Sequence, residues 1–453
     1  MKQFKKLFFS SVITITFLPS LSLAADLLSL YKKAENYDAD IAAAQLAYEA
    51  EKEGENLSLA SLLPTLNGSV SAAHVNYDGQ FQDKNIYQTK TYVVSLTQPI
   101  INMPSWYALN SSEQNTLKAH AVYLAAEQNL ILDVSSAYFT VLREQENLRS
   151  DRSQETAFKR QYEQAKEQFD VGLIAITEVH DAHASFDSAK TNRIRSEGNL
   201  TIAKENLSRI TGEPFTSLDT LKKDFPIIMD ESQSADQWVE IAYQFNLDIK
   251  VADFTLKALQ QELKSKRALH LPTLDLSANY SLTNYNNYTS SGFTRFIEVD
   301  DKDKRSDITL SLNVPLYSGG GTQAGIRQTR FKVEQAKRLL VSEQRQVRLD
   351  TRTEYINLTT NIQTIESLKK NIVSRESALE AIREGYKVGT RNIVEVLDAE
   401  RNYFTALRDY ANARFDFVES TFRIKRAAGT LNIADIESLN AWLETRNSNP
   451  TNN

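Results

Sequence analysis

The sequence predicts a mixed α/β membrane protein in which one set of parts, two membrane-type strands and a long helical hairpin, occurs twice. Three observations lead to this fold class. Glycine and proline together make up about 5% of the 453 residues, fewer than a fold of many short elements needs at its turns. The chain repeats itself after roughly 200 residues. Each repeat contains both alternating and seven-residue apolar patterns.

The composition excludes several kinds of protein. Charged residues make up 24% of the chain and the mean hydropathy is −0.42, which argues against a helical membrane protein. Lys and Arg number 52 against 58 Asp and Glu, so there is no basic excess for a nucleic acid partner. The chain has no cysteine and five histidines, which excludes thiolate chemistry and leaves little material for a metal centre. We expect no cofactor, no metal and no nucleic acid.

The N-terminus has the pattern of an export signal. Lysines precede the apolar stretch Leu7–Leu18, and Ser22–Ala24 supplies the small residues that signal peptidase accepts. We expect residues 1–25 to be a cleaved signal peptide; a membrane anchor is the alternative, but Pro19 interrupts a stretch that is already short. No later run of eighteen apolar residues appears, so the exported chain could enter a membrane only as strands.

The internal repeat is clearest in one motif. Val171–Ala182 returns as Val388–Ala399, 217 residues later, and Gly212 and Gly429 keep the same spacing. A repeat of this length is a duplicated half of a fold. The predicted repeats are 26–235 and 236–431.

Each repeat carries two predicted strands with one polar and one apolar face. Apolar residues alternate with Thr, Ser, Asn and Asp in 273–284 and 306–316, and more weakly in 65–78 and 89–100. A soluble sheet packed on a core would alternate in the same way. Spans of about ten residues with aromatics near their ends and a polar loop such as Asn284–Arg305 match membrane-barrel strands, with the loop outside.

The helical part of each repeat is a hairpin. The long helices 104–170 and 323–387 contain no internal proline and would each be roughly 100 Å long. Apolar residues such as Val134, Val141 and Leu148 recur every seven residues, which is typical of a coiled-coil seam.

A glycine ends each long helix. Val171-Gly172 and Val388-Gly389 interrupt the helical pattern, and returning helices are predicted at 173–212 and 391–429. Both repeats are therefore predicted to be helical hairpins with tips at these residues.

Closure of the sheet predicts the number of subunits. In a membrane every backbone polar group must be bonded, so the strands must form a closed barrel. One chain supplies four strands, whereas the smallest barrels have eight. Two chains would give eight strands, and the side chains inside such a barrel fill its interior. Three chains give twelve strands and a backbone diameter of roughly 24 Å, which leaves an aqueous bore. We expect a homotrimer around a shared water path.

The order of elements, the Leu-Pro-Thr-Leu strand starts at 63–66 and 271–274, and the tip motifs beginning at Val171 and Val388 resemble the TolC family of outer-membrane efflux ducts. The resemblance covers essentially the whole mature chain. It implies a trimeric twelve-stranded outer-membrane β-barrel, four strands per chain, continued by a long periplasmic α-helical barrel of coiled-coil hairpins. It also implies an equatorial girdle formed by 213–246 and 431–453.

The function implied by the resemblance is a passive exit duct of tripartite efflux and type I secretion systems. Such a duct lies in outer-membrane lipid, extends into the periplasm and is closed at rest at its periplasmic entrance. A periplasmic adaptor (membrane fusion) protein and an inner-membrane RND or ABC transporter open it. The alternative is an exported trimeric coiled-coil surface or adhesin-like protein, which accounts for the heptads but not for the strands. We find no catalytic site, so we expect no enzyme.

The site residues are carried over from the family's motifs. Glu395 and Asp398, three residues apart on one helix face, match the family's acidic ring, in which crowded carboxylates raise one another's pKa and select cations. Glu395 is an Asp in the familiar pattern. The gate-closing contacts match Tyr386 and Arg391 on the second hairpin, against Thr177 and Glu178 on the first. The adaptor contact matches the tip residues Val171, Gly172, Val388 and Gly389.

Overall fold

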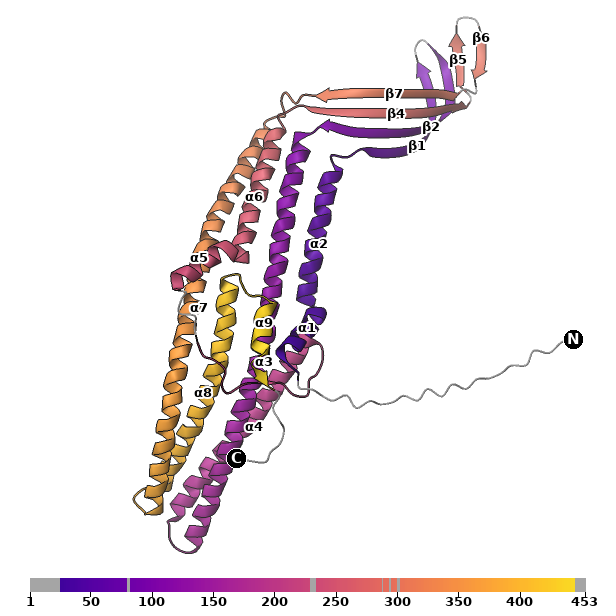
Figure 1. The fold of residues 1–453 in the computed structure, drawn as a ribbon. Coiled ribbons are helices and arrows are strands. Elements are labelled where there is room, and N and C mark those ends of the chain that lie inside the picture. The colour runs from indigo at the N-terminus through magenta and orange to yellow at the C-terminus, as the bar shows by residue number, and fades with distance from the viewer. Residues whose placement is uncertain are drawn as a thin grey trace, which may run out of the picture.

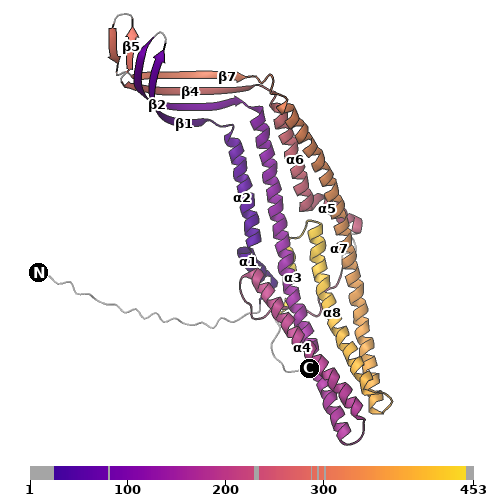
Figure 2. The same cartoon turned by 180° about the vertical axis from the view of Figure 1, so that it is seen from behind.

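The computed structural model describes residues 25–79, 82–228, 234–286, 288–292, 295–299 and 302–444. The predicted signal peptide therefore lies outside the described residues, apart from Ala25. The described chain is elongated, with a sheet at one end, a column of helices in the middle and two helical hairpin tips at the other end (Figures 1 and 2). Strands and helices occupy separate parts of its length.

The four long strands form one antiparallel sheet in the order β1-β2-β4-β7, so the central pair joins the two repeats. A short hairpin, β5–β6, stands beyond the sheet's far end (Figure 1). The strands are β1 (Thr65–Gly79), β2 (Gln82–Ile101), β4 (Thr273–Asn286), β5 (Tyr288–Gly292), β6 (Arg295–Val299) and β7 (Lys302–Asn313).

The pairing register sorts side chains into two faces. One row that crosses all four strands is apolar and consists of Leu66, Leu96, Ala278 and Ile308. The next row along the strands is polar and consists of Asn67, Ser95, Asn279 and Asp307. Because successive residues of a strand point to opposite faces, the sheet has one apolar and one polar face. Large apolar side chains on the apolar face are exposed to solvent, and Ile308 is 79% exposed.

Three strand predictions need correction. The strand predicted at 306–316 is β7, which runs from Lys302 to Asn313 because its pairing with β4 begins and ends at these residues. β2 begins at Gln82, earlier than the predicted 89, because its hydrogen-bonded pairing with β1 continues through residues that have no alternating pattern. The predicted polar loop at 284–305 is also wrong in part, because it contains the β5–β6 hairpin. β5 is mostly polar, and the apolar residues Phe296, Ile297 and Val299 of the five-residue β6 do not form a regular alternation, so the hairpin gave no clear strand pattern.

The helices of the two repeats follow one plan. Each repeat has a short helix, a medium helix that rises to the sheet, a long helix that descends from it and a returning helix (Figure 1). The first repeat contains α1 (Leu27–Tyr37), α2 (Ala39–Ala60), α3 (Met103–Asp170) and α4 (Ile176–Thr211). The second contains α5 (Ala235–Phe245), α6 (Leu247–Ala268), α7 (Gly321–Lys387) and α8 (Ile393–Ala427). None of the helices in the described ranges combines the length and the apolarity of a membrane span.

The repeat extends to the helix caps. The carboxylate of Asp38 accepts hydrogen bonds from the backbone N–H groups that open α2, and Asn246 does the same for α6. Short polar residues that cap a helix in this way favour a break between consecutive helices. The same kind of break therefore separates α1 from α2 and α5 from α6.

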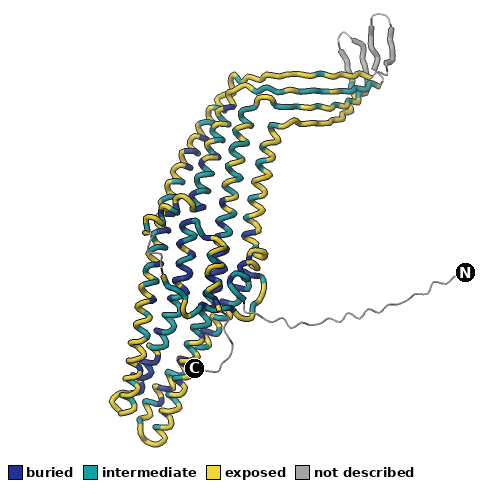
Figure 3. The backbone as a smooth tube through the Cα atoms, viewed as in Figure 1, coloured by how far each residue is buried: buried dark blue, intermediate teal, exposed yellow. Residues whose placement is uncertain are grey.

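The main core lies at mid-height, where the returning helices α4 and α8 end beside α3 (Figure 3). Tyr138 and Phe139 of α3 are fully buried there, and the Tyr138 hydroxyl donates to the carbonyl of Asp219 at 2.6 Å. Burial raises the pKa of Tyr138, which keeps it a neutral donor. The elements around this core include α9 (Ile433–Asn440) and the two-residue strands β3 (Thr220–Leu221) and β8 (Leu443–Glu444), which pair with each other.

Candidate functional site

Each hairpin tip is a turn with a left-handed glycine. Gly172 has φ 74° directly after Val171, which caps α3, and Gly389 has φ 76° directly after Val388, which caps α7. A positive φ after a helix suits glycine because it carries no Cβ. The repeated Val-Gly pair is therefore a chain reversal that both hairpins share.

The returning helices begin later than the sequence predicted. α4 begins at Ile176 and not at 173, and α8 begins at Ile393 and not at 391. The intervening residues complete the cap of the preceding helix: the Leu173 N–H donates to the Gln168 carbonyl at 2.8 Å. In the second hairpin the Thr390 N–H donates to the Gly385 carbonyl at 2.9 Å. The residues that were predicted to start the next helix instead donate hydrogen bonds to the last carbonyls of the preceding helix.

The hairpin tips expose apolar side chains at the end of the molecule, next to a packed apolar cluster. Val171 and Val388 are 70% and 74% exposed, and Leu173 is exposed as well. Next to the tips, toward the rest of the column, the two hairpins share one apolar cluster, which holds the tips together as a pair. Its buried members are Phe158, Ala165, Val179, Ala182, Ala189, Ile393, Val396 and Leu397.

Arg391 is bound within its own hairpin. Its guanidinium donates to Glu395 at 2.6 Å, one helical turn away, and Glu395 also belongs to the capping box of α8 with Asn392. Gly385 allows this geometry, because a Cβ there would lie 2.8 Å from the Arg391 Cγ. Across the described residues, the structure does not bring Arg391 to Thr177 or Glu178 within one chain.

The hydrogen bond from Arg391 lowers the pKa of Glu395. The raised pKa expected for crowded carboxylates concerns the carboxylates of several copies around one axis, and it stays a prediction. Asp398 lies on the same helix with its side chain half exposed, and Arg401 donates to it at 2.9 Å. Each carboxylate of the candidate ring thus has its own arginine, and both side chains are partly open to water.

Tyr386 joins the two hairpins, but through a residue that sequence reasoning missed. Its hydroxyl donates to Gln168 Oε1 of α3 at 3.0 Å. Burial, and to a smaller extent the charge of Glu178, raises the pKa of Tyr386. Glu178 is therefore close enough to act on Tyr386 by charge, while Thr177 remains exposed at the start of α4.

A second link between the hairpins was also missed. Glu400 of α8 is 1% exposed and accepts from Arg383 of α7 at 2.6 Å and from Gln161 of α3 at 3.4 Å. Gln161 and Gln168 stand seven residues apart on α3, and so share one face of the coiled coil. The visible signal in the sequence is Glu400 itself, which lies seven residues after the buried Ile393 on the apolar stripe of α8.

The fold and the site together define a class of protein. A sheet with one apolar and one polar face is joined to a column of helical hairpins, whose tips lie far from the sheet (Figure 1). Two carboxylates with arginine partners lie in the first turns of α8, next to one tip. This combination fits the class of elongated membrane ducts.

Comparisons with known proteins agree with this class. The family model described as outer membrane efflux protein matches residues 30–213 and 238–430. The chain is 32% identical to outer membrane protein TolC of Vibrio cholerae, over 98% of this chain and 99% of that protein. It is 31% identical to TolC of Escherichia coli, over 96% and 88% of the two chains.

More distant comparisons agree as well. The chain is 26% identical to the proteases secretion protein PrtF of Dickeya chrysanthemi, over 93% of this chain and 92% of that protein. Among solved structures it superposes on CusC with TM-score 0.77 at 17% identity, covering 90% and 95% of the two chains. The Campylobacter jejuni CmeC channel gives TM-score 0.75 at 16% identity, covering 92% and 90%. The last two likenesses show the fold.

The chain belongs to the outer membrane efflux protein family. It is therefore an outer-membrane exit duct that extends into the periplasm, and it is not an enzyme.

Proposed function

We propose that three copies of the chain form one twelve-stranded β-barrel, through which drugs or secreted proteins leave the cell. The sheet supports this proposal. Its polar row suits a water path and its exposed apolar row suits lipid, but within one chain β1 and β7 are edge strands. Because lipid offers no hydrogen bonds, edges in a membrane must pair with the edges of further copies.

Apolar side chains on the helices also support association of copies. α7 exposes Phe331 to 73% and Val373 to 62%, and α2 exposes Leu57 to 75%. Such side chains, spread along a charged and otherwise soluble helix, gain free energy when a neighbouring copy covers them. Other members of this exposed set are Leu339, Leu349 and Ile356 on α7, Leu46 on α2, and Ile194 and Ile202 on α4.

The entrance is proposed to lie at the hairpin tips. Three copies would bring Glu395 and Asp398 together around the axis as an acidic ring that favours cations. Tyr386 holds the hairpins together within a chain, and we propose that Arg391 reaches Thr177 or Glu178 of a neighbouring copy when the entrance is closed. Exposed pairs of this kind contribute about 0–1 kcal/mol each, which suits a gate that a partner opens.

Partners are proposed from the exposed tips and from the relatives. Val171, Gly172, Val388 and Gly389 present an apolar surface at the end of the column, which suits a periplasmic adaptor protein. An inner-membrane RND or ABC transporter would supply the cargo. The relative named for protease secretion supports a role in type I secretion as well as in efflux. The equatorial girdle is proposed to consist of 213–246 and 431–453. The structure describes 213–228, 234–246 and 431–444 of these segments, in which β3 pairs with β8.

The observation that carries the proposal is the two-faced sheet with two open edges. The direct test is conductance of the purified full-length protein in planar lipid bilayers. We expect discrete, cation-selective conductance steps and heat-modifiable trimers in the outer-membrane fraction. A protein that leaves bilayers sealed and runs as a monomer under native conditions would contradict the proposal. The alternative, a surface fibre or adhesin-like protein, predicts trimers without conductance.

A further inference from the structure

Four exposed cations lie at the ends of the helices that meet the sheet. Lys264 and Arg267 belong to the last two turns of α6, and Arg327 and Arg330 belong to the first three turns of α7. At 1.5 Å per residue, all four lie within about 14 Å of the helix end nearest the sheet. We call these four residues the basic collar.

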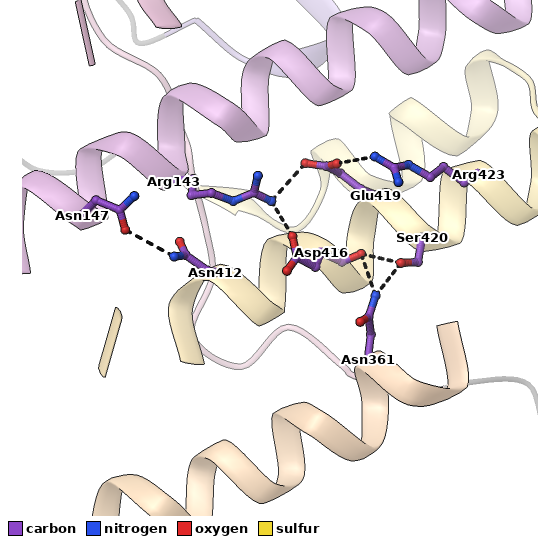
Figure 4. A network of polar contacts seen from close by, with 8 residues as sticks. All are labelled: Arg143, Asn147, Asn361, Asn412, Asp416, Glu419, Ser420 and Arg423. Carbon is purple, nitrogen blue, oxygen red and sulfur yellow. Dashed lines mark hydrogen bonds and ion pairs between the residues drawn. The ribbon is translucent and has the colours of Figure 1, made fainter. Parts of the chain in front are cut away.

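The collar differs from the charged groups farther from the sheet. There, cations have carboxylate partners: Arg143 of α3 donates to Asp416 at 2.5 Å and to Glu419 at 3.3 Å, both on α8 (Figure 4). Within the described ranges, no ion pair joins a collar cation to a carboxylate. The collar is therefore a patch of uncompensated positive charge.

The nearby acidic residues account for this. Residues 321–333 of α7 contain no Asp or Glu, and Glu334, the first acidic residue, pairs with Lys337 and Arg338. On α6, Glu262 precedes Lys264 by two residues, and side chains two apart on a helix do not face each other.

The α6 part of the collar lies on the outer side of the column. Lys264 lies over the ring of Tyr107 of α3, 5.9 Å from its centroid. Tyr107 and Gln128 are three heptads apart on α3 and so share one face. Lower down, Gln128 donates to the carbonyl of Leu431 in the proposed girdle at 2.9 Å. Because a girdle surrounds the column, this face is the outer one.

The α7 part lies on the same side. Arg352 donates to Asp236 of α5, which also belongs to the proposed girdle. Arg330 and Arg327 precede Arg352 by 22 and 25 residues, about six and about seven helical turns, so the three arginines share a face. Side chains on a helix lean toward its N-terminus, which in α7 is the end at the sheet. Both arginines therefore lean toward the sheet.

Apolar side chains fill the interval between the sheet and the collar. Trp106 at the start of α3 is 54% exposed, Leu271 before β4 is 45% exposed, and Leu316 after β7 is 92% exposed. With the apolar row of the sheet, the order along the molecule is apolar strand, aromatic and apolar junction, basic collar. A lipid leaflet has the matching order of acyl chains, interface and phosphate groups.

We propose that the basic collar binds the phosphate groups of anionic phospholipids in the periplasmic leaflet. Arginine forks onto phosphate through two parallel hydrogen bonds, and lysine and arginine close to a membrane surface are attracted by anionic lipid. Continuity with the apolar face of the sheet favours lipid over a soluble acidic partner. The inference rests on the proposed function, because only a sheet inserted in lipid brings the collar to a membrane surface.

The test uses Trp106 as a probe of the lipid beside the collar. Brominated acyl chains quench tryptophan only on close approach, and the other two tryptophans, Trp238 and Trp442, pack against the main core at mid-height. The full-length protein is placed in vesicles of equal parts phosphatidylcholine and phosphatidylglycerol, with one or the other lipid brominated. The ratio of the two degrees of quenching measures the preference for anionic lipid.

We expect a several-fold preference for phosphatidylglycerol at low salt. It should disappear near 1 M salt, where the Debye length is about 3 Å. Replacing all four collar cations by glutamine should abolish it at low salt as well. The matched control replaces four exposed cations near the hairpin tips by glutamine and should keep the preference; these are Arg160, Lys166, Lys369 and Arg375.

Equal quenching by the two lipids in the wild-type protein, or a preference that survives in the collar variant, would overturn the proposal. Binding of polyglutamate by a protein that shows equal quenching would assign the collar to a soluble acidic partner instead. The salt titration of the wild-type protein needs no variant, so the test stands even if the collar variant fails to fold. Bilayer conductance tests the duct separately, and a conducting protein with equal quenching would refute the lipid site alone.

Discussion

The Tyr386 hydroxyl donates to Gln168 Oε1 at 3.0 Å, and this bond ties the second hairpin to the first just above their tips. The Glu400 carboxylate, which bonds Arg383 and Gln161, forms a second tie. The two ties use residues seven apart on α3, so they act on one face of that helix. An entrance that opens by separating the hairpins must break both.

Tyr386→Phe should make the entrance easier to open. The substitution removes one hydroxyl per chain and keeps the ring, and a neutral hydrogen bond contributes about 0.5–1.5 kcal/mol. Summed over three copies, we expect at least a several-fold increase in open-state occupancy in planar bilayers. Tyr317→Phe, at a tyrosine that is 87% exposed, is the control and should behave as wild type. Equal occupancy in the Tyr386 and Tyr317 variants would show that the hydroxyl does not hold the gate.

Arg391→Ser should loosen the entrance and shift its pH dependence. Without Arg391 the pKa of Glu395 rises from its lowered position toward its ordinary value. Glu395 would then still be charged at neutral pH. On acidification it would lose its charge at a higher pH than in the wild-type protein. We expect the fall in cation selectivity, measured as reversal potential in a salt gradient, to begin at higher pH than in wild type. Unchanged conductance and an unchanged profile would contradict this role.

Glu400→Gln should destabilise the hairpins. The carboxylate is buried, and its loss removes a charge-assisted bond to Arg383, so we expect a cost of about 1–3 kcal/mol in the free energy of unfolding. Arg383→Gln should cost a similar amount, and the double variant less than the sum of the two, because the residues share one interaction. Strict additivity in denaturant unfolding would show that the pair is not coupled.

Two glycine substitutions should have opposite effects. Gly429 has φ 75° and lies against the backbone of Phe245 and Asn246, so Gly429→Ala forces both strain and a clash and should cost more than about 1 kcal/mol in the free energy of unfolding.

Gly198 lies inside α4 with nothing close to its missing Cβ, and Gly198→Ala should stabilise the protein by about 0.4–1 kcal/mol. Thermal unfolding checks both, and a Gly429→Ala variant as stable as wild type would rule out the proposed close contact.

The sequence predicted best those features that depend on a few neighbouring residues. The Val-Gly pairs at 171–172 and 388–389 mark both chain reversals, since a left-handed turn needs glycine locally. The ties through Gln168 and Glu400 were not predicted, because a heptad pattern shows that a residue faces a neighbouring helix but not which residue it meets. Glu400 on an apolar stripe was a usable signal. The β5–β6 hairpin combines a mostly polar strand with a short strand whose apolar residues do not alternate regularly, so a period-two pattern did not reveal it.

The acidic ring illustrates a different limit. Motif spacing placed Glu395 and Asp398 on one face, but the effect of Arg391 on Glu395 depends on a side-chain contact one turn away. Whether the ring carboxylates of several copies also repel one another depends on the assembly.

The central claim, that separate copies close one barrel through β1 and β7, is tested most directly by edge-to-edge cross-linking. One cysteine is placed in β1 and one in β7 of the cysteine-free chain, and a reagent that spans less than about 10 Å is added. Within a chain these strands are separated by β2 and β4, at roughly 14 Å, whereas paired strands lie about 4.8 Å apart. We predict covalent dimers and trimers, with trimers as the largest product. Exclusively monomeric chains after complete reaction would contradict the account.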